Sequence, residues 1–298
     1  MSLIPLLLVL AASVSSSGFD LFRKVLVKHL APVPMVFLLA TASVPLFGAA
    51  VVFGNPAPVE PAYWLPALGS VVLNVVANLT FLEAVRISPL SVTVPLLSLT
   101  PVFTALLGFA LLGELPAPLA LVGIALVVVG AFWLNVGMTA GSGEAAPGGQ
   151  RSLARAFFSQ PGAWLMAGTA LLLSLTIPLD KLAVRRASPP FHGLVLTAGI
   201  ALGALAVLAV QKRWSELAGL SRGWKPFVLA LISSTLALGF QLVALQVGVL
   251  VSLIETLKRG IGNLLAVILG RAVFGETVTP GKLAAALLMA AGVALILL

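Results

Sequence analysis

The chain has 298 residues, of which 60% are hydrophobic and only 9% are charged, and its mean hydropathy is +1.16. A soluble domain of this length does not need so much apolar surface, so the composition indicates that lipid surrounds most of the chain. The net charge of +8 does not indicate nucleic-acid binding, because Lys and Arg lie mostly in short segments between apolar runs. The absence of cysteine excludes a disulfide framework and thiolate metal sites.

The apolar residues come in unbroken runs near the ~20 residues that cross a bilayer as a helix, whereas strands of a transmembrane barrel would alternate apolar and polar residues. Pro, Gly and charged residues divide these runs into ten predicted spans, the first of which is interpreted as a retained span and not as a signal peptide. The expected fold class is therefore all-α, a polytopic membrane protein. The spans cover residues 3–24, 33–53, 63–84, 90–112, 117–137, 162–180, 191–210, 226–246, 249–270 and 279–298.

The two halves of the sequence resemble each other. The segment around Asp20 in the first span has a counterpart around Asp180 in the sixth, and both place an Asp before basic residues and a Pro. The Gly113-Glu114 pair after the fourth span corresponds to Gly275-Glu276 after the ninth. The offsets of these two anchors are nearly equal, which makes a chance similarity improbable.

The repeat predicts two domains of five helices each, residues 1–137 and 161–298, joined by a Gly-, Ala- and Ser-rich linker at 138–160. Because each copy has an odd number of spans, the second copy must enter the membrane the opposite way up. Inverted repeats of this kind build many secondary transporters, with a binding site near the membrane midplane between the copies. The expected architecture is two inverted five-helix repeats around a central cavity.

The ninth span carries charged residues, which are costly to place inside a membrane. On a helix, Glu255, Lys258, Arg259 and Asn263 fall on one side, and leucines and isoleucines fall on the other. One Glu cannot neutralise two cations, so we expect at least one of the cations to seek a further anion. Two interpretations remain open: a buried ion network that only locks helices together, and a direct role in handling a substrate or ion.

Other spans offer further candidates for a polar cavity. In the first span, Ser17 and Asp20 lie on one stripe, although the end of that span can also be at the membrane interface. Asn74 and Asn78 lie one helical turn apart in the third span, where they line a cavity or form interhelical hydrogen bonds. Gln241 in the eighth span is a further interior candidate.

The sequence carries no recognisable enzyme motif. His29 and His192 stand at span ends without a companion, which excludes an HExxH zinc site, and no Walker A sequence is present. We therefore expect a protein that is not an enzyme and that holds no cofactor and no metal.

Asp180 and Lys181 are expected at the membrane interface, because two arginines follow them closely.

The closing segments of the two halves are TPVFTALLGFALLGELPAPLALVGIALVVVGAF and GNLLAVILGRAVFGETVTPGKLAAALLMAAGVALILL. With ten spans in two halves, they resemble the EamA domains of the drug/metabolite transporter superfamily over nearly the whole chain. The resemblance implies a bundle whose central cavity is lined chiefly by spans one, three, four, six, eight and nine. It also implies an integral membrane protein of, we expect, the bacterial cytoplasmic (inner) membrane. Few aromatic residues lie in these spans, which argues against a quaternary-ammonium substrate.

The resulting hypothesis is a secondary active transporter of a small polar metabolite, anionic or zwitterionic, that works by alternating access. Lys258 and Arg259 would attract the anionic part of the substrate, and Glu255 would hold these two side chains in position. The expected partners are this substrate, membrane lipid and a proton or an exchanged counter-substrate, with a homodimer left open and no nucleic acid. The alternatives are a flippase for a lipid-linked phosphate, which the same cations would serve, and a membrane scaffold or sensor that transports nothing.

Overall fold

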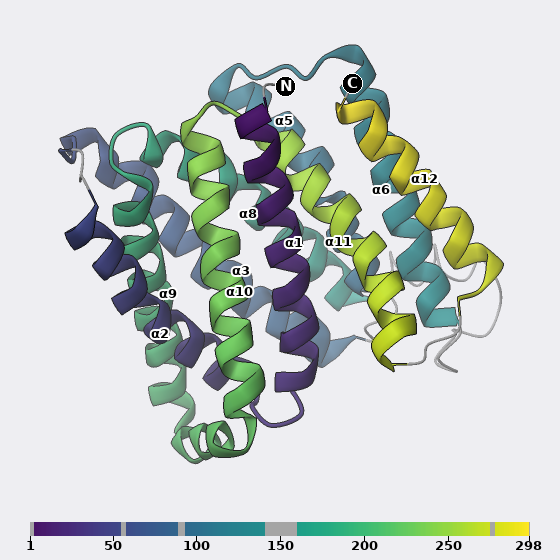
Figure 1. The fold of residues 1–298 in the computed structure, drawn as a ribbon. Coiled ribbons are helices and arrows are strands. Elements are labelled where there is room, and N and C mark those ends of the chain that lie inside the picture. Colours follow the sequence, from purple (N-terminus) through teal and green to yellow (C-terminus); the bar gives the residue numbers. More distant parts are fainter. Residues whose placement is uncertain (1–2, 55–57, 89–92, 141–159, 275–277, 298) are drawn as a thin grey trace. The chain divides into compact units, whose positions relative to one another are not determined.

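The computed structural model describes residues 3–54, 58–88, 93–140, 160–274 and 278–297, which are helical and contain no β-strand (Figure 1). The all-α class predicted from the sequence is confirmed. The helices are α1 (Leu3–Leu26), α2 (Pro32–Phe53), η1 (Pro61–Tyr63), α3 (Trp64–Ile87), η2 (Val94–Leu99), α5 (Thr100–Leu112), α6 (Pro118–Ala140), α8 (Pro161–Val184), α9 (Pro189–Gln211), η3 (Trp214–Gly219), α10 (Leu220–Gln246), α11 (Val251–Phe274) and α12 (Pro280–Leu297), where η marks a 3-10 helix.

Eight helical segments in the described ranges are long and apolar enough to cross a membrane, and α6 holds a shorter apolar stretch at Pro118–Leu134. Large apolar side chains such as Phe53, Leu65 and Val210 are more than four-fifths exposed, as expected of residues that contact lipid. The chain is a polytopic membrane protein. Helix α11 is not among the eight, because Glu255, Lys258 and Arg259 lower its hydropathy.

The fourth predicted span is not one continuous α-helix. It begins as η2 and continues as α5, with Pro95 and Pro101 in the first turns of these two elements. Proline is tolerated there, since the first N–H groups of a helix have no partner inside it. Helix α5 ends at Gly113, whose φ of +67° is a left-handed conformation that glycine adopts without a steric penalty.

The chain forms two compact units, and each draws helices from both halves of the sequence. The first, the α6–α12 unit, comprises Val76–Pro178 and Leu250–Leu298. The second, the α1–α10 unit, comprises Ser2–Val75 and Leu179–Val249. The predicted division of the sequence into repeats 1–137 and 161–298 stays a prediction, and most of the predicted linker lies outside the described residues.

In the α6–α12 unit, α6 packs on α12, and α11 packs on both α5 and α12 (Figure 1). A methyl group added at Gly123 would lie 2.6 Å from the carbonyl oxygen of Gly292, and one added at Gly130 would lie 2.6 Å from Met289. Residue numbers rise along α6 as they fall along α12, so the two helices run antiparallel. The predicted inverted repeat would make α6 and α12 equivalent, and equivalent helices of such a repeat run in opposite directions.

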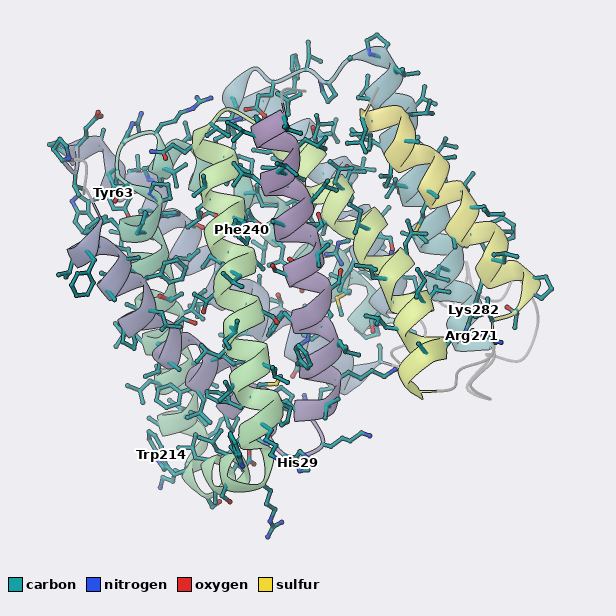
Figure 2. All side chains as sticks on the ribbon, viewed as in Figure 1. His29, Tyr63, Trp214, Phe240, Arg271 and Lys282 are labelled. Atoms are coloured by element: carbon teal, nitrogen blue, oxygen red, sulfur yellow. The ribbon has the colours of Figure 1, made fainter. Side chains whose placement is uncertain are left out.

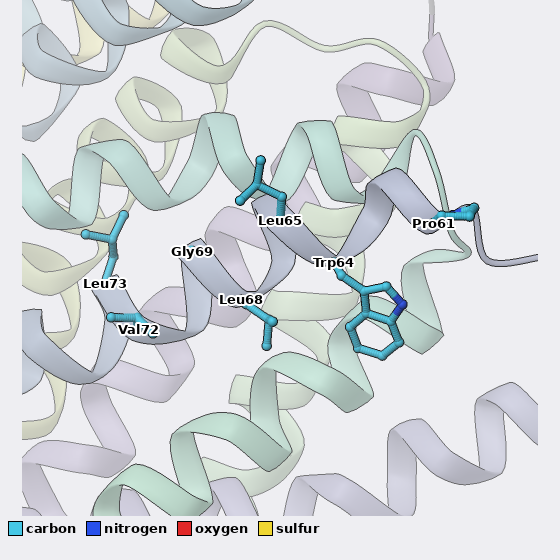
Figure 3. A pocket seen from close by; sticks show the side chains of 7 residues that line it. All are labelled: Pro61, Trp64, Leu65, Leu68, Gly69, Val72 and Leu73. Carbon is cyan, nitrogen blue, oxygen red and sulfur yellow. The ribbon is translucent and has the colours of Figure 1, made fainter.

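In the α1–α10 unit, α1 packs on α10 and α2 packs on α9. The glycines of the GxxxG motif in α9, Gly199 and Gly203, approach α3 so closely that a methyl group at Gly203 would lie 2.5 Å from Val75. This motif serves close helix packing, as its spacing predicts. On the same unit, an open apolar hollow runs along η1 and α3 (Figure 3). It is lined by Pro61, Trp64, Leu65, Leu68, Gly69, Val72 and Leu73, a lining suited to lipid and not to a polar substrate.

Candidate anion site and a second buried polar cluster

The start of helix α11 is fixed by a glycine turn and by a side-chain cap. Gly248, with a φ of +95°, turns the chain between α10 and α11. The side chain of Glu114 then accepts a hydrogen bond from the backbone N–H of Val251 at 2.9 Å. A carboxylate at this place satisfies one of the four N–H groups that a helix start leaves unpaired, and it meets the positive end of the helix dipole. The Gly113-Glu114 pair thus ends one helix and caps another.

About one turn of α11 and the start of α5 bring the predicted charges together in the α6–α12 unit. Arg259 Nε lies 3.1 Å from Glu255 Oε1, and Lys258 Nζ lies 3.5 Å from Glu255 Oε2. The hydroxyl of Thr100 completes the group: Oγ1 lies 3.1 Å from Glu255 Oε1 and accepts a hydrogen bond from Arg259 Nε at 3.1 Å. We call Thr100, Glu255, Lys258 and Arg259 the α11 cluster.

The α11 cluster holds two cations and one anion, so its net charge is +1. The side chain of Glu255 is only 8% exposed, while those of Lys258 and Arg259 are 24% and 32% exposed. Both hydrogen bonds of Arg259 start from Nε, so its two terminal nitrogens have no partner among the described residues. A guanidinium presented in this way has the planar donor geometry that binds carboxylates and phosphates.

Thr100 is the member of the cluster that sequence reasoning missed. Its backbone carbonyl accepts a hydrogen bond from Ser174 of α8 at 3.0 Å, and its side chain also lies 2.8 Å from the carbonyl of Leu97. These contacts fix the hydroxyl at the junction of η2 and α5. A threonine before a proline gives no sign in sequence that it will contact a helix some 155 residues later.

Asn263, predicted on the same stripe, does not join the α11 cluster within the described contacts. Its side-chain nitrogen lies 3.8 Å from the sulfur of Met289 in α12. Asn78 is half-buried on α3 in the same unit. The first two turns of α11, up to Leu257, are buried on all sides, so its apolar face there meets protein and not lipid.

The other predicted site residues belong to the α1–α10 unit. Asn74 donates to the backbone carbonyl of Ser70 at 3.0 Å, and Gln241 is buried in α10. Ser17 is buried, and its hydroxyl bonds to the carbonyl of Ser13 at 2.8 Å. Asp20 is exposed and pairs with Arg23 at 2.8 Å, the arrangement expected at an interface.

A second polar cluster contradicts two expectations. His192 was expected without a companion, yet its Nε2 lies 3.1 Å from Asp180 Oδ1 and its Nδ1 lies 3.1 Å from the hydroxyl of Tyr63. Asp180 and Lys181 were expected at the interface, yet they are 3% and 1% exposed. The reason is tertiary: η1, α8 and α9 meet here, and Phe191 and Trp64 pack around Tyr63.

Comparison with known proteins agrees with the fold. Residues 3–136 match the model of the EamA-like transporter family. These residues form an EamA domain, the domain type of the drug/metabolite transporter superfamily. The resemblance seen in the sequence is thereby confirmed for residues 3–136, and an EamA domain is a domain of integral membrane transporters of this superfamily's kind.

A solved crystal structure shares the fold of this chain, with a TM-score of 0.72 at 17% sequence identity. The match covers 97% of this chain and 94% of the other. No curated protein sequence matches the chain. The solved structure therefore supports the fold alone, and the assignment of a substrate depends on the residues of this chain.

Proposed function

We propose that the protein is a secondary active transporter of a small polar metabolite that carries a carboxylate or a phosphate, and that it works by alternating access. Residues 161–298 would form a second EamA-like repeat behind the linker at 138–160. The antiparallel packing of α5 with α11 and of α6 with α12 supports this division. A bacterial cytoplasmic membrane is the proposed location.

The observation that carries the proposal is the guanidinium of Arg259, which is held by Nε while its terminal nitrogens have no partner in the described part of the chain. Those terminal nitrogens are the donors that bind a carboxylate or a phosphate in a bidentate manner. Here Glu255 is shared by Lys258 and Arg259, and the terminal guanidinium nitrogens stay available in the described part of the chain. An anionic group of the substrate would complete the cluster when it binds.

Each member of the cluster has a proposed role. Arg259 binds the anionic group in a bidentate manner, and Lys258 adds a second positive charge. Glu255 and Thr100 hold the guanidinium by Nε and so direct its terminal nitrogens outward. Asn263, Asn78, Asn74, Ser17, Asp20 and Gln241 remain proposed polar lining residues of the transport route.

A thermal-shift screen tests the proposal. Purified protein in detergent is heated with amino acids, nucleotides and sugar phosphates, and Lys258→Ala and Arg259→Ala are screened beside the wild type. Arg271→Ala is the matched control, because Arg271 is an exposed arginine at the other end of the same helix (Figure 2). We expect a stabilising compound that loses its effect in the two cluster variants only. Equal stabilisation of all four proteins would refute the anion site.

A further inference from the structure

A chain of hydrogen bonds runs through the buried end of the α1–α10 unit. The Tyr63 hydroxyl lies 3.1 Å from His192 Nδ1, and His192 Nε2 lies 3.1 Å from Asp180 Oδ1. The hydroxyl of Ser70 donates to the same carboxylate oxygen at 2.5 Å. Asn74 then donates to Ser70, to its carbonyl at 3.0 Å and to its hydroxyl at 3.4 Å. We call Tyr63, His192, Asp180, Ser70 and Asn74 the relay chain.

Packing alone does not account for an ionisable pair at this depth. Tyr63, Ser70 and His192 are fully buried, and Asp180 is 3% exposed. Well-packed apolar residues of the same volume are often as stabilising as a buried charged pair, or more so. Residues that gain or lose a proton inside a membrane protein commonly mark a pathway for protons or ions.

Two basic side chains close to this pair in the sequence donate to backbone carbonyls. Lys181 follows Asp180, and its ammonium donates to the carbonyls of Val249 at 2.5 Å and Gly248 at 3.4 Å. These carbonyls lie just past the C-terminus of α10, where the helix dipole is negative. Arg186, a half-buried residue between α8 and α9, donates to the carbonyl of Ala62 in η1 at 2.9 Å.

The other elements packed here add little charge. Helix α2 has no titratable side chain, and α9 has none except His192. The charged residues of α1 and α10 lie toward the other end of the unit, where His29 is close to Gly223. Figure 2 shows His29 far from Tyr63. The remaining charged groups near the relay chain are exposed: they are Glu60 and Arg185.

We propose that Asp180 and His192 form a proton-binding site through which the protein couples proton movement to transport. In the neutral state, His192 Nε2–H donates to the carboxylate and Nδ1 accepts from the Tyr63 hydroxyl. A proton that reaches the Tyr63 oxygen from water displaces the hydroxyl proton onto Nδ1. Tyr63 keeps one proton, His192 gains one, and the charge of the Asp180–His192 pair changes from −1 to 0.

The position of the relay chain suits entry from one membrane surface. Tyr63 follows Pro61 and Ala62, which are exposed, so the chain begins near solvent. Eleven residues separate Tyr63 from Asn74, which is about 16 Å along a helix and about half the ~30 Å hydrocarbon thickness. Asn74 is also a proposed lining residue, so coupling to substrate rests on the proposed function, whereas proton binding itself does not.

Histidine NMR tests proton binding without a substrate. The chain has two histidines, so in His29→Gln the two ¹⁵N-imidazole signals both come from the ring of His192. Spectra are recorded as the pH is lowered from about 8 to about 5, and proton binding by the pair should make the signals of the doubly protonated ring appear. Asp180→Asn should reduce that change, and Tyr63→Phe, a milder variant, should shift the Nδ1 resonance. A single neutral tautomer throughout this range would overturn the proposal.

Proteoliposomes with a trapped pH dye test the coupling. Compounds that stabilise the wild type in the screen are added outside, and proton movement is followed together with compound uptake. We expect Asp180→Asn and His192→Gln to lose proton movement to the level of protein-free liposomes, while the compound still stabilises both against heat. His29→Gln should behave as the wild type.

Wild-type proton movement in Asp180→Asn would overturn the coupling. If no compound stabilises the wild type or is taken up by it, the proposed function fails instead, and the histidine spectra still decide whether the proton site exists.

Discussion

Removing the carboxylate of the α11 cluster should move stability and anion affinity in opposite directions. Glu255→Gln keeps the size of the side chain and an oxygen that Thr100 and Arg259 can contact. It removes the only negative charge of the cluster, whose net charge then rises from +1 to +2. Lys258 and Arg259 lose the charge that holds them at 3.5 Å and 3.1 Å.

The magnitudes follow from exposure and distance. A buried hydrogen bond to a charged group contributes about 1.5–3 kcal/mol, and the partial exposure of the two cations screens part of this, so we expect a loss of roughly 2 kcal/mol in the free energy of unfolding. In the wild type, the Glu255 carboxylate repels a bound anion roughly 6 Å away by about 3 kcal/mol at an effective dielectric constant of ~20. The Glu255→Gln variant removes this repulsion. That change corresponds to about a hundredfold tighter binding.

Both effects can be measured on one purified sample. Unfolding in denaturant gives the change in stability, and thermal shifts across a series of inorganic phosphate concentrations give the change in anion affinity. Arg259→Ala should weaken the phosphate response by about ten- to a hundredfold, as loss of a charge-assisted hydrogen bond implies. A Glu255→Gln variant as stable as the wild type, with an unchanged phosphate response, would refute this electrostatic reasoning.

Two further predictions concern the packing and capping of the α6–α12 unit. Gly292→Ala puts a methyl group 2.6 Å from the carbonyl of Gly123 and should cost about 1–3 kcal/mol of unfolding free energy. Gly168→Ala, with open space around the new methyl group, should be neutral or gain up to about 1 kcal/mol, and equal losses in both would contradict the close helix crossing. Glu114→Ala removes the cap of α11 and should cost about 1 kcal/mol in denaturant unfolding, and an unchanged value would show that Val251 N–H finds another acceptor.

The sequence alone predicts the helices of this protein well. Every predicted span is helical over most of its described residues, because long apolar runs punctuated by Pro, Gly and charge leave few alternatives in a membrane. The fourth is divided into η2 and α5. The charged stripe of α11 was also predicted, since Glu255, Lys258 and Arg259 lie on neighbouring turns of one helix. Their mutual contacts are local, and local contacts follow directly from helical geometry.

Contacts between distant segments could not be predicted in the same way. Thr100 and Glu114 meet α11 only because α5 packs against it, and neither residue signals its partner in the sequence. The pairing of His192 with Asp180 depends on how α8 and α9 fold back on each other. The arginines after Asp180 suggested an interface, whereas the packing of η1 and Tyr63 buries the carboxylate.

Pro95 and Pro101 mark the start of the fourth span as a place where a helix can bend, but they do not determine the form that the bend takes. Whether the segment bends, kinks or changes to a 3-10 helix depends on which carbonyls the surrounding helices satisfy. In the structure, Ser174 of α8 bonds to the carbonyl of Thr100, a contact that no local pattern encodes.

The central claim is that Arg259 binds the anionic group of the transported metabolite. Uptake of a compound that stabilises the wild type, measured in proteoliposomes for the wild type, Arg259→Ala and Arg271→Ala, tests it most directly. We predict that Arg259→Ala loses uptake and that Arg271→Ala retains it. Uptake by Arg259→Ala at the wild-type rate and with the wild-type concentration dependence would contradict the claim.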